Sequence, residues 1–393
     1  LKMVALGLVP DLTAKAARTA ASNAGAKVVK TFAYEISGSE QQEIYDINPD
    51  LVLLCGGTDG GNKEVIISNA KHLVAIDRPF TTIVAGNKSA NDDIKAIFNE
   101  AGKDVVITEN VMPQFNKLNI EPARDAIRQL FISRIIEAKG LNILQAMTPY
   151  KIIPTPLAVL HACELLSKGT KTQQGRGDLL AVDIGGATTD VYSMASGEPT
   201  VDNTMLKGLP EPWMKRTVEG DLGMRYSLTH VFEQIPGADN SENEYMQQVK
   251  AWVELCTARP DTLAAPGSEE EKLEEFLGRS AVSMAVERHC GRIADVFTPL
   301  GLMHTQEGKD LMNVPSVIGI GGVLRNSRRP EEILKGSLYD FMHPECTKPR
   351  KPKFYLDQKY IFASMGLLRS INPELAFELL DKETVEIGCN ATV

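Results

Sequence analysis

The first part of the chain alternates short apolar runs with longer amphipathic stretches. Apolar runs typical of buried strands lie at residues 3–9, 26–33, 51–55, 81–85 and 105–108. Helical patterns fill the gaps between them, at residues 11–24, 39–45, 62–70 and 92–101. Asp11 and Gly25 are the expected N-cap and stop of the first of these helices. Strand and helix repeated in this order predict a parallel sheet covered by helices.

The pattern changes beyond residue 121, where longer helices replace the regular alternation. The expected elements are helices at 123–138, 157–167, 216–232, 244–257 and 272–291, paired strands at 179–191, and a strand at 314–324. An extended link rich in proline lies at 148–156. We therefore expect two α/β domains, the first over residues 1–115 and the second over residues 116–393.

The most informative segment is the pair of apolar runs around Asp183 and the turn that joins them. Gly185 and Gly186 lack a Cβ, so their backbone N–H groups can approach an anion closely. Thr188 and Thr189 add hydroxyl donors beside that turn. Asp183 ends the first strand, where its carboxylate can hold a water of a Mg²⁺ ion. The segment therefore predicts a phosphate-binding loop between two strands.

Two other glycine-rich segments follow predicted strands. Residues 55–62 lie between a strand and a helix, but lack both the dinucleotide-binding glycine spacing and a P-loop lysine. A tight structural turn and a ligand-binding turn are equally compatible with that segment. Gly321 and Gly322 end the apolar run 314–324, where a structural turn is again the alternative to a ligand role.

Composition and charge restrict the classes of partner. The net charge of −9 argues against nucleic acid, because no basic excess is available to neutralise phosphates. No apolar run approaches the roughly 20 residues that span a bilayer, and no signal-peptide pattern is present. The six cysteines include no Cys-x-x-Cys pair, which favours reduced thiols. We expect a cytoplasmic protein that binds neither nucleic acid nor membrane.

The hairpin at Asp183 and the glycines at 321–322 together resemble the second phosphate loop and the adenosine loop of the actin/Hsp70/sugar-kinase superfamily. Further blocks resemble one family within it, the MutL family associated with adenosylcobalamin-dependent glutamate (methylaspartate) mutase, which is unrelated to the mismatch-repair protein of that name. These blocks are Gly7 to Thr13, Leu53 to Asn62, Thr108 to Pro113 and Arg216 to Arg225. The resemblance covers essentially the whole chain.

That resemblance implies an actin-like (ribonuclease H-like) ATPase core with an additional parallel α/β domain, residues 1–115, which contacts the client. It implies ATP and Mg²⁺ as cofactors, and subunits of an adenosylcobalamin-dependent mutase as partners. ATP binding and hydrolysis would drive the exchange of damaged cobalamin, so the protein would act as a reactivating factor. A small-molecule kinase of the same superfamily is the alternative activity, and another aminomutase, such as ornithine mutase, the alternative client.

The resemblance also implies roles for single residues. Asp183 would hold Mg²⁺ through water, and the ATP contacts would come from Gly185, Gly186, Thr188, Thr189, Gly321, Gly322 and Arg325. Glu219 or Asp221 could orient the attacking water, although an N-cap or a salt link to Arg216 or Arg225 fits them equally well. Asp190 could simply serve as an acceptor within the hairpin.

One expected element is missing from the sequence. No Asp-x-Gly loop of the first-phosphate type lies upstream of residue 183, and the chain begins at Leu1, inside a predicted strand. Either a preceding segment supplies that loop, or the molecule does not hydrolyse ATP. We also find no Asp-x-His-x-x-Gly turn, so direct cobalamin binding by this chain is not expected.

Overall fold

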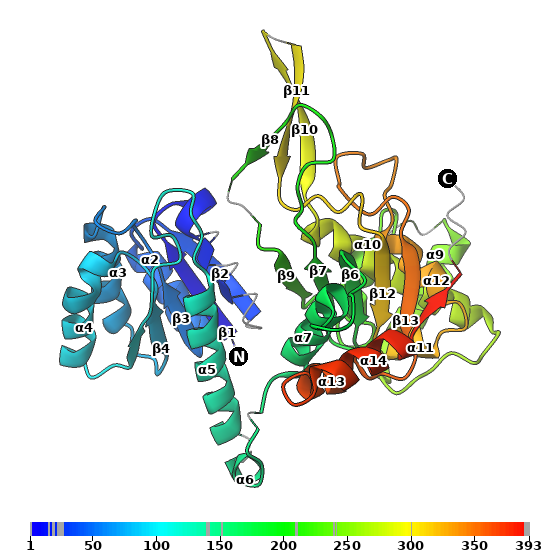
Figure 1. Cartoon of the computed structure of the whole chain (residues 1–393), viewed down its shortest axis with the longest axis horizontal. Helices are drawn as coiled ribbons and strands as arrows, with labels where there is room; N and C mark the ends of the chain where they lie inside the picture. Colours follow the sequence, from blue (N-terminus) through cyan, green and yellow to red (C-terminus); the bar gives the residue numbers. More distant parts are fainter. Residues whose placement is uncertain are drawn as a thin grey trace. The chain divides into compact units, whose positions relative to one another are not determined.

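The computed structural model describes residues 2–14, 16–17, 20–21, 27–138, 142–150, 152–208, 211–238, 240, 242–299 and 301–388. The chain forms two compact units (Figure 1). Unit 1 comprises Leu1–Pro154 and Gly208–Pro210, and unit 2 comprises Thr155–Lys207 and Glu211–Val393.

Unit 1 is built on a five-stranded parallel sheet with the order β2-β1-β3-β4-β5. Its strands are β1 (Lys2–Gly7), β2 (Lys27–Ala33), β3 (Leu51–Leu54), β4 (Thr81–Val84) and β5 (Val105–Ile107). Its helices are α2 (Gly38–Ile47), α3 (Glu64–Val74), α4 (Asn91–Glu100), α5 (Glu121–Ala138) and α6 (Asn142–Ala146), with short turns η1 (Pro10–Ala14) and η2 (Lys88–Ala90). The predicted strands and the predicted parallel sheet are confirmed.

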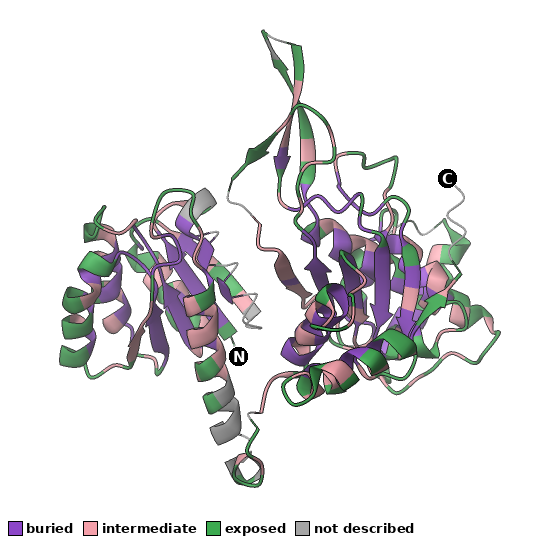
Figure 2. Ribbon diagram, in the orientation of Figure 1, coloured by how far each residue is buried: buried purple, intermediate pink, exposed green. Residues whose placement is uncertain are grey.

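Both faces of this sheet are buried (Figure 2). Alternate side chains of a strand point to opposite faces, so Leu51 and Leu53 enter one apolar cluster while Val52 and Leu54 enter another. The expected helix over residues 11–24 begins one residue before Asp11, as the π-helix η1. Asp11 therefore lies inside this helix and is not its N-cap, and Gly25 lies outside the described residues. The division between the units falls after Pro154, whereas the sequence places it after residue 115.

The later boundary has a packing explanation. Ile120, Ala123 and Ile127, at and within the start of α5, are buried in the same cluster as Leu51 and Leu53. Helix α5 therefore covers one face of the unit 1 sheet and belongs to that unit.

Unit 2 is built on a mixed six-stranded sheet with the order β14-β13-β12-β6-β7-β9. Its strands are β6 (Leu179–Ile184), β7 (Thr189–Met194), β9 (Met214–Glu219), β12 (Ser316–Ile320), β13 (Lys353–Asp357) and β14 (Thr384–Ile387). Strands β6, β7 and β9 are antiparallel neighbours, β12 and β13 run parallel to β6, and β14 is antiparallel to β13.

Helices cover the unit 2 sheet. They are α7 (Thr155–Lys168), α8 (Leu228–Glu233), α9 (Glu244–Ala258), α10 (Glu269–His289), α11 (Gly322–Asn326), α12 (Pro330–Leu334), α13 (Phe362–Leu368) and α14 (Pro373–Glu383), with the short turn η3 (Lys335–Ser337). Helix α10 contributes Ala281 and Ala285 to the cluster that contains Leu180 and Val182 of β6. Helices α7 and α13 cross closely, because a Cβ on Gly366 would lie 1.8 Å from the Ala158 carbonyl oxygen.

The expected helix over 216–232 is wrong at its start, where residues 214–219 form strand β9. Arg216 lies on the buried side of this strand, 4% exposed, beside Asp190 of β7. A charged residue at an inward position hides the apolar alternation that marks a strand.

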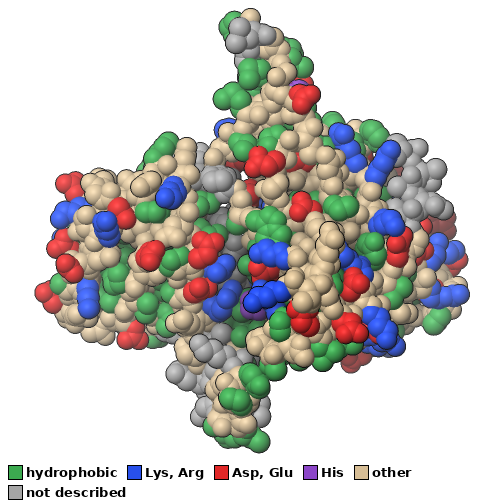
Figure 3. Space-filling view, in the orientation of Figure 1, with side chains coloured by type: hydrophobic (Ala, Val, Ile, Leu, Met, Phe, Trp, Pro, Cys, Tyr) green, Lys and Arg blue, Asp and Glu red, His purple; other side chains and the backbone are tan. Residues whose placement is uncertain are grey.

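A second, three-stranded sheet projects from unit 2 (Figure 1). We call it the arm; it consists of β8 (Thr204–Lys207), β10 (Arg292–Thr298) and β11 (Gly301–Glu307), in the order β10-β11-β8. Hydrophobic side chains are visible along it in Figure 3, and Met205, Leu206 and Leu302 are exposed. Across the described residues of both units, every helix is too short or too polar to cross a bilayer.

Candidate functional site

Polar residues gather where three neighbouring parallel strands of unit 2 end. Asp183 lies near the end of β6, Gly321 follows β12, and Asp357 ends β13. Asp183 is paired with Ile320 across the β6–β12 ladder, so these strand ends are adjacent. Open α/β sheets place their ligands at the carboxyl ends of strands, and we therefore take this edge as the candidate site.

Gly321 brings the two predicted glycine turns together. Its φ is +101°, a conformation that favours glycine. A Cβ at this position would lie 2.4 Å from the Ile184 carbonyl oxygen and 2.8 Å from Oδ1 of Asp183. Only glycine therefore fits between β12 and the end of β6.

The turn after β6 is held from one side by residues 223–226. The N–H of Met224 donates to the Gly185 carbonyl at 3.0 Å, and the N–H of Arg225 and that of Tyr226 donate to the Gly186 carbonyl at 2.8 Å. The N–H of Gly185, expected to approach the anion, instead donates to the Thr188 carbonyl at 2.9 Å. Within the described part of the chain, the N–H groups of Gly186 and Ala187 have no backbone acceptor. The carbonyls of the turn are thus fixed, and two amide donors remain open to an anion.

The two threonines of the turn differ in their surroundings. Thr188 is partly exposed, and its hydroxyl donates to Oδ2 of Asp190 at 3.3 Å. Thr189 is completely buried, and its hydroxyl donates to the Leu222 carbonyl at 2.6 Å. The Thr189 hydroxyl therefore fastens the segment after β9 to β7, while the Thr188 hydroxyl lies at the surface of the turn.

Carboxylates outnumber positive charges at this edge. Asp190 is paired with Arg216 through contacts of 2.5 and 2.9 Å, so the hairpin does need an acceptor at this position. Burial, followed by the nearby Asp190 and Asp357, raises the pKa of Asp183 to about 7, against the opposing effect of Arg216. A cation bound here would relieve the excess of negative charge.

Asp357 and Tyr360 were missed by the sequence reasoning. Asp357 is buried and accepts from the N–H groups of Ile361 and Phe362 at 2.9 and 3.1 Å, which orders the start of α13. Tyr360 adopts a positive φ of 58° beside it. A sequence signal for Asp357 was available, because it ends an apolar strand that precedes a helix. Asp183 was identified in part by the same pattern of an apolar strand ending in aspartate.

The acidic pair at the end of β9, Glu219 and Asp221, is held by one arginine of α10. Arg288 contacts Glu219 at 2.7 Å and Asp221 at 2.8 and 2.9 Å. The expected alternative of a salt link is therefore present, with Arg288 as a partner. Arg216 also pairs with Asp190, and Arg225 pairs with Glu274 at 2.6 Å. Hydrogen bonds from Arg288 hold the pKa of Asp221 below its usual range, so it stays ionised.

Gly322 and Arg325 lie in α11, directly after Gly321. Both are exposed, and the N–H of Arg325 donates to the Gly321 carbonyl at 3.0 Å. The positive charge of Arg325 counteracts the raised pKa values of Asp357 and Tyr360, which places it at the same edge.

The glycine-rich turn of unit 1 is internally bonded. The Asn87 side chain accepts from the Gly60 N–H at 3.1 Å and donates to the carbonyls of Gly61 and Asn62. These hydrogen bonds to Asn87 fit the alternative of a tight structural turn for this segment.

Direct coordination of a metal by several side chains is not supported. No group of three or more histidine, cysteine, aspartate or glutamate side chains converges among the described residues. Mg²⁺ usually keeps several waters and takes only one or two carboxylates together with substrate phosphates. A single carboxylate such as that of Asp183, two residues before the Gly185–Gly186 turn, is compatible with that mode.

The comparisons with known proteins agree in family. A family model described as MutL protein matches residues 1–384. The protein MutL of Clostridium tetanomorphum is 46% identical over 390 residues, which cover 98% of this chain and 84% of that protein. A nucleotide-free acetone carboxylase, from a study of ATP-dependent acetone carboxylation, is 13% identical with a TM-score of 0.31. The match covers 93% of this chain and 58% of the carboxylase chain, and carries no argument at that score.

Proposed function

The chain belongs to the MutL protein family, and we propose that it is an ATP-dependent accessory protein that reactivates an adenosylcobalamin-dependent mutase. The observation that carries the ATP site is the contact of Gly321 with Asp183 and Ile184. It joins an open amide turn, a carboxylate and a glycine-lined strand end at one sheet edge. Glutamate (methylaspartate) mutase is the proposed client.

The strand topology supports an actin-like core in unit 2. Read from β9, the order β9-β7-β6-β12-β13 has three antiparallel strands followed by two parallel ones. In the proposed core, β6 and β7 carry the phosphate loop and β12 carries the adenosine loop. Unit 1 is then the proposed client-contacting domain, with its boundary moved to Pro154.

Different residues are proposed to contact the phosphates, the adenosine and the Mg²⁺ ion. In this proposal the N–H groups of Gly186 and Ala187 donate to phosphate oxygens, and the Thr188 hydroxyl does so by turning away from Asp190. The Gly185 N–H and the Thr189 hydroxyl, which were expected to contact phosphate, donate within the protein instead. Gly321 and Gly322 let the backbone approach the adenosine, with Arg325 beside it. Bound Mg²⁺ would be held through water by Asp183 and would neutralise phosphate charge.

Glu219 and Asp221 remain the proposed water-orienting carboxylates. Both are fixed by Arg288, and Asp221, whose pKa is depressed, accepts a hydrogen bond from water without taking its proton. We therefore assign them to positioning the water. The Glu219→Gln variant is expected to reduce hydrolysis while leaving nucleotide affinity unchanged.

The decisive experiment replaces Asp183 in the full-length protein. Asp183→Ala is expected to abolish Mg-ATP hydrolysis, and Asp381→Asn, an exposed aspartate of α14, serves as the matched control. Circular dichroism checks that the fold is retained. Unchanged turnover in the Asp183 variant would contradict the proposed site, and a phosphorylated small metabolite would favour the kinase alternative.

A further inference from the structure

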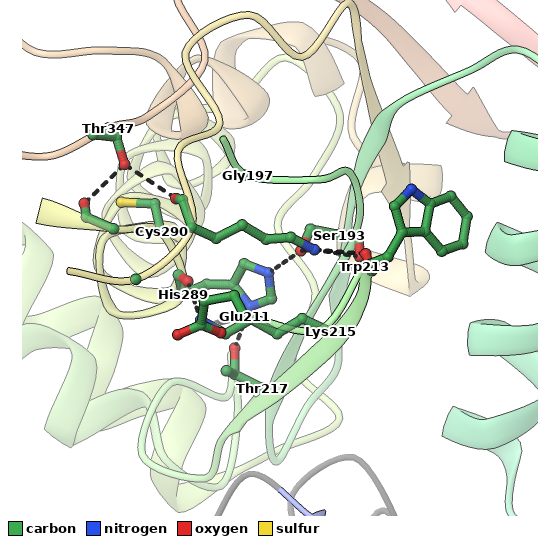
Figure 4. Close-up of polar contacts among 12 residues, drawn as sticks. Ser193, Gly197, Glu211, Trp213, Lys215, Thr217, His289, Cys290 and Thr347 are labelled. Carbon is green, nitrogen blue, oxygen red and sulfur yellow. Dashed lines mark hydrogen bonds and ion pairs between the residues drawn. The ribbon is translucent and has the colours of Figure 1, made fainter. Parts of the chain in front are cut away.

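A second polar cluster lies inside unit 2, at the base of the arm (Figure 4). Lys309 follows β11 by two residues and is completely buried. Its Nζ donates to the Trp213 carbonyl at 2.6 Å, to the Ser193 hydroxyl at 3.2 Å and to the Ser193 carbonyl at 3.4 Å. Three acceptors thus meet the three donors of an ammonium group.

The cluster continues from Ser193 to α10 and β9. His289 is also completely buried, and its Nε2 lies 2.8 Å from the Ser193 hydroxyl. Its Nδ1 lies 2.8 Å from the Thr217 hydroxyl. Burial, together with Lys215 and Lys309, lowers the pKa of His289 well below its usual range, so the ring is neutral.

The donor groups fix the direction of the hydrogen bonds that run from Lys309 through Ser193 and His289 to Thr217. A lysine ammonium only donates, so the Ser193 oxygen accepts from Lys309 and its proton points to Nε2 of His289. Nε2 is then the acceptor, and Nδ1 carries the ring proton and donates to Thr217. Protonated Lys309 therefore selects one tautomer of His289 through Ser193.

Lys309 also ties the two ends of the arm to the body of unit 2. Its carbonyl accepts from the Gly291 N–H at 2.7 Å, directly before β10, and from the Thr347 hydroxyl at 3.1 Å. Gly197, with a φ of +72°, packs against its side chain, since a Cβ there would lie 2.2 Å from Cγ of Lys309. One side chain thus connects the arm to β7 and to the residue before β9.

We propose that Lys309, Ser193, His289 and Thr217 form a proton-ordered switch at the base of the arm, in which the protonation state of Lys309 sets the tautomer of His289. When the lysine passes one proton to Ser193, Ser193 passes its own to Nε2, and Nδ1 passes its proton to Thr217. The Thr217 hydroxyl releases its proton towards solvent, so one proton leaves the chain. Neutral Lys309 then keeps two donors for its three former partners, but it no longer buries a charge. Because burial lowers the pKa of Lys309, protonation favours opening of this buried contact and the neutral lysine favours its retention.

The charged groups around the switch set where it responds. Burial, with the nearby Lys215, lowers the pKa of Lys309 to about 7, while Glu211 and Asp178 oppose that shift. Lys215 donates to the His289 carbonyl at 2.9 Å and pairs with Glu211 at 3.0 Å (Figure 4). The switch therefore responds around neutral pH, and its midpoint depends on these neighbours.

The test follows the His289 tautomer by nitrogen-15 NMR of the full chain labelled at its six histidines. We expect the protonated nitrogen to be Nδ1 below pH 7 and Nε2 above it, with the ring neutral throughout. Lys215→Gln is expected to move the midpoint to higher pH, and Glu211→Gln to lower pH. A general loosening of the fold would not move the midpoint of the tautomer transition in opposite directions in these two variants.

Two variants interrupt the chain of hydrogen bonds from Lys309 to Thr217. In Lys309→Met and in Ser193→Ala the His289 tautomer is expected to be independent of pH. Ser193→Ala removes a single oxygen, so it keeps the test available if Lys309→Met does not fold. One fixed tautomer across the range in the unaltered chain, an imidazolium signal, or an unchanged transition in Ser193→Ala would overturn the proposal.

Discussion

The buried ion pair between Asp190 and Arg216 allows a sharp prediction of stability. The two residues are 6% and 4% exposed, and the guanidinium makes two contacts with one carboxylate oxygen of Asp190. Asp190→Ala removes the carboxylate of this pair and weakens the charge compensation of a buried guanidinium. Breaking a buried pair in this way costs about 3–5 kcal/mol of unfolding free energy.

A double variant distinguishes the effect of removing the whole ion pair from the effect of removing one partner. Arg216→Met alone leaves Asp190 unpaired beside Asp183, so we expect a loss at least as large as that of Asp190→Ala. Asp190→Leu combined with Arg216→Met removes both charges and replaces them with apolar groups. Such replacements are often neutral or stabilising, by about 1–4 kcal/mol, so the double variant is expected to be more stable than either single one.

Tryptophan fluorescence during urea unfolding is a suitable assay. The two tryptophans, Trp213 and Trp252, both lie in unit 2, so the signal reports on the unit that contains the pair. Glu269→Gln, in an exposed pair with Lys272, is the control and is expected to change little. A loss in Asp190→Ala no larger than in this control would refute the reasoning.

Three further variants test other features of the fold. Gly366→Ala places a Cβ 1.8 Å from the Ala158 carbonyl oxygen and should cost about 1–3 kcal/mol in a urea titration, whereas Gly38→Ala, with open space around it, should not. His289 stays neutral when folded, so stability should fall below pH 6.5 by at most about 1.4 kcal/mol per pH unit, because the unfolded chain takes up a proton. His289→Gln should flatten that part of the pH profile of the urea midpoint. Ser37→Ala breaks the capping box of α2 and should cost about 1 kcal/mol, measured by circular dichroism during thermal unfolding.

Much of unit 1 could be predicted because its signals are local. An apolar strand such as Leu51–Leu54 is buried on both faces and reads as a continuous hydrophobic run. The hairpin at Asp183 was equally legible, since its glycines and flanking strands are contiguous. That Asp183 and Gly321 serve one nucleotide site was expected only through the family resemblance, and their contact was not predicted.

The misses depend on long-range pairing. Strand β9 was not recognised because Arg216 occupies an inward position, and its partner Asp190 lies on another strand. Arg288 was not foreseen as the partner of Glu219, because nothing local marks a residue of α10 as its neighbour. The boundary was set too early because α5 resembles any amphipathic helix until its packing on Leu51 and Leu53 is known.

The position of Gly321 against Asp183 also governs when the proposed site can exist. The two residues are far apart in the sequence, and they meet only after β12 has paired with β6. A chain still emerging from the ribosome, with β12 unfinished, therefore has the hairpin but no completed pocket. Nucleotide would bind only the finished sheet and would stabilise it by mass action.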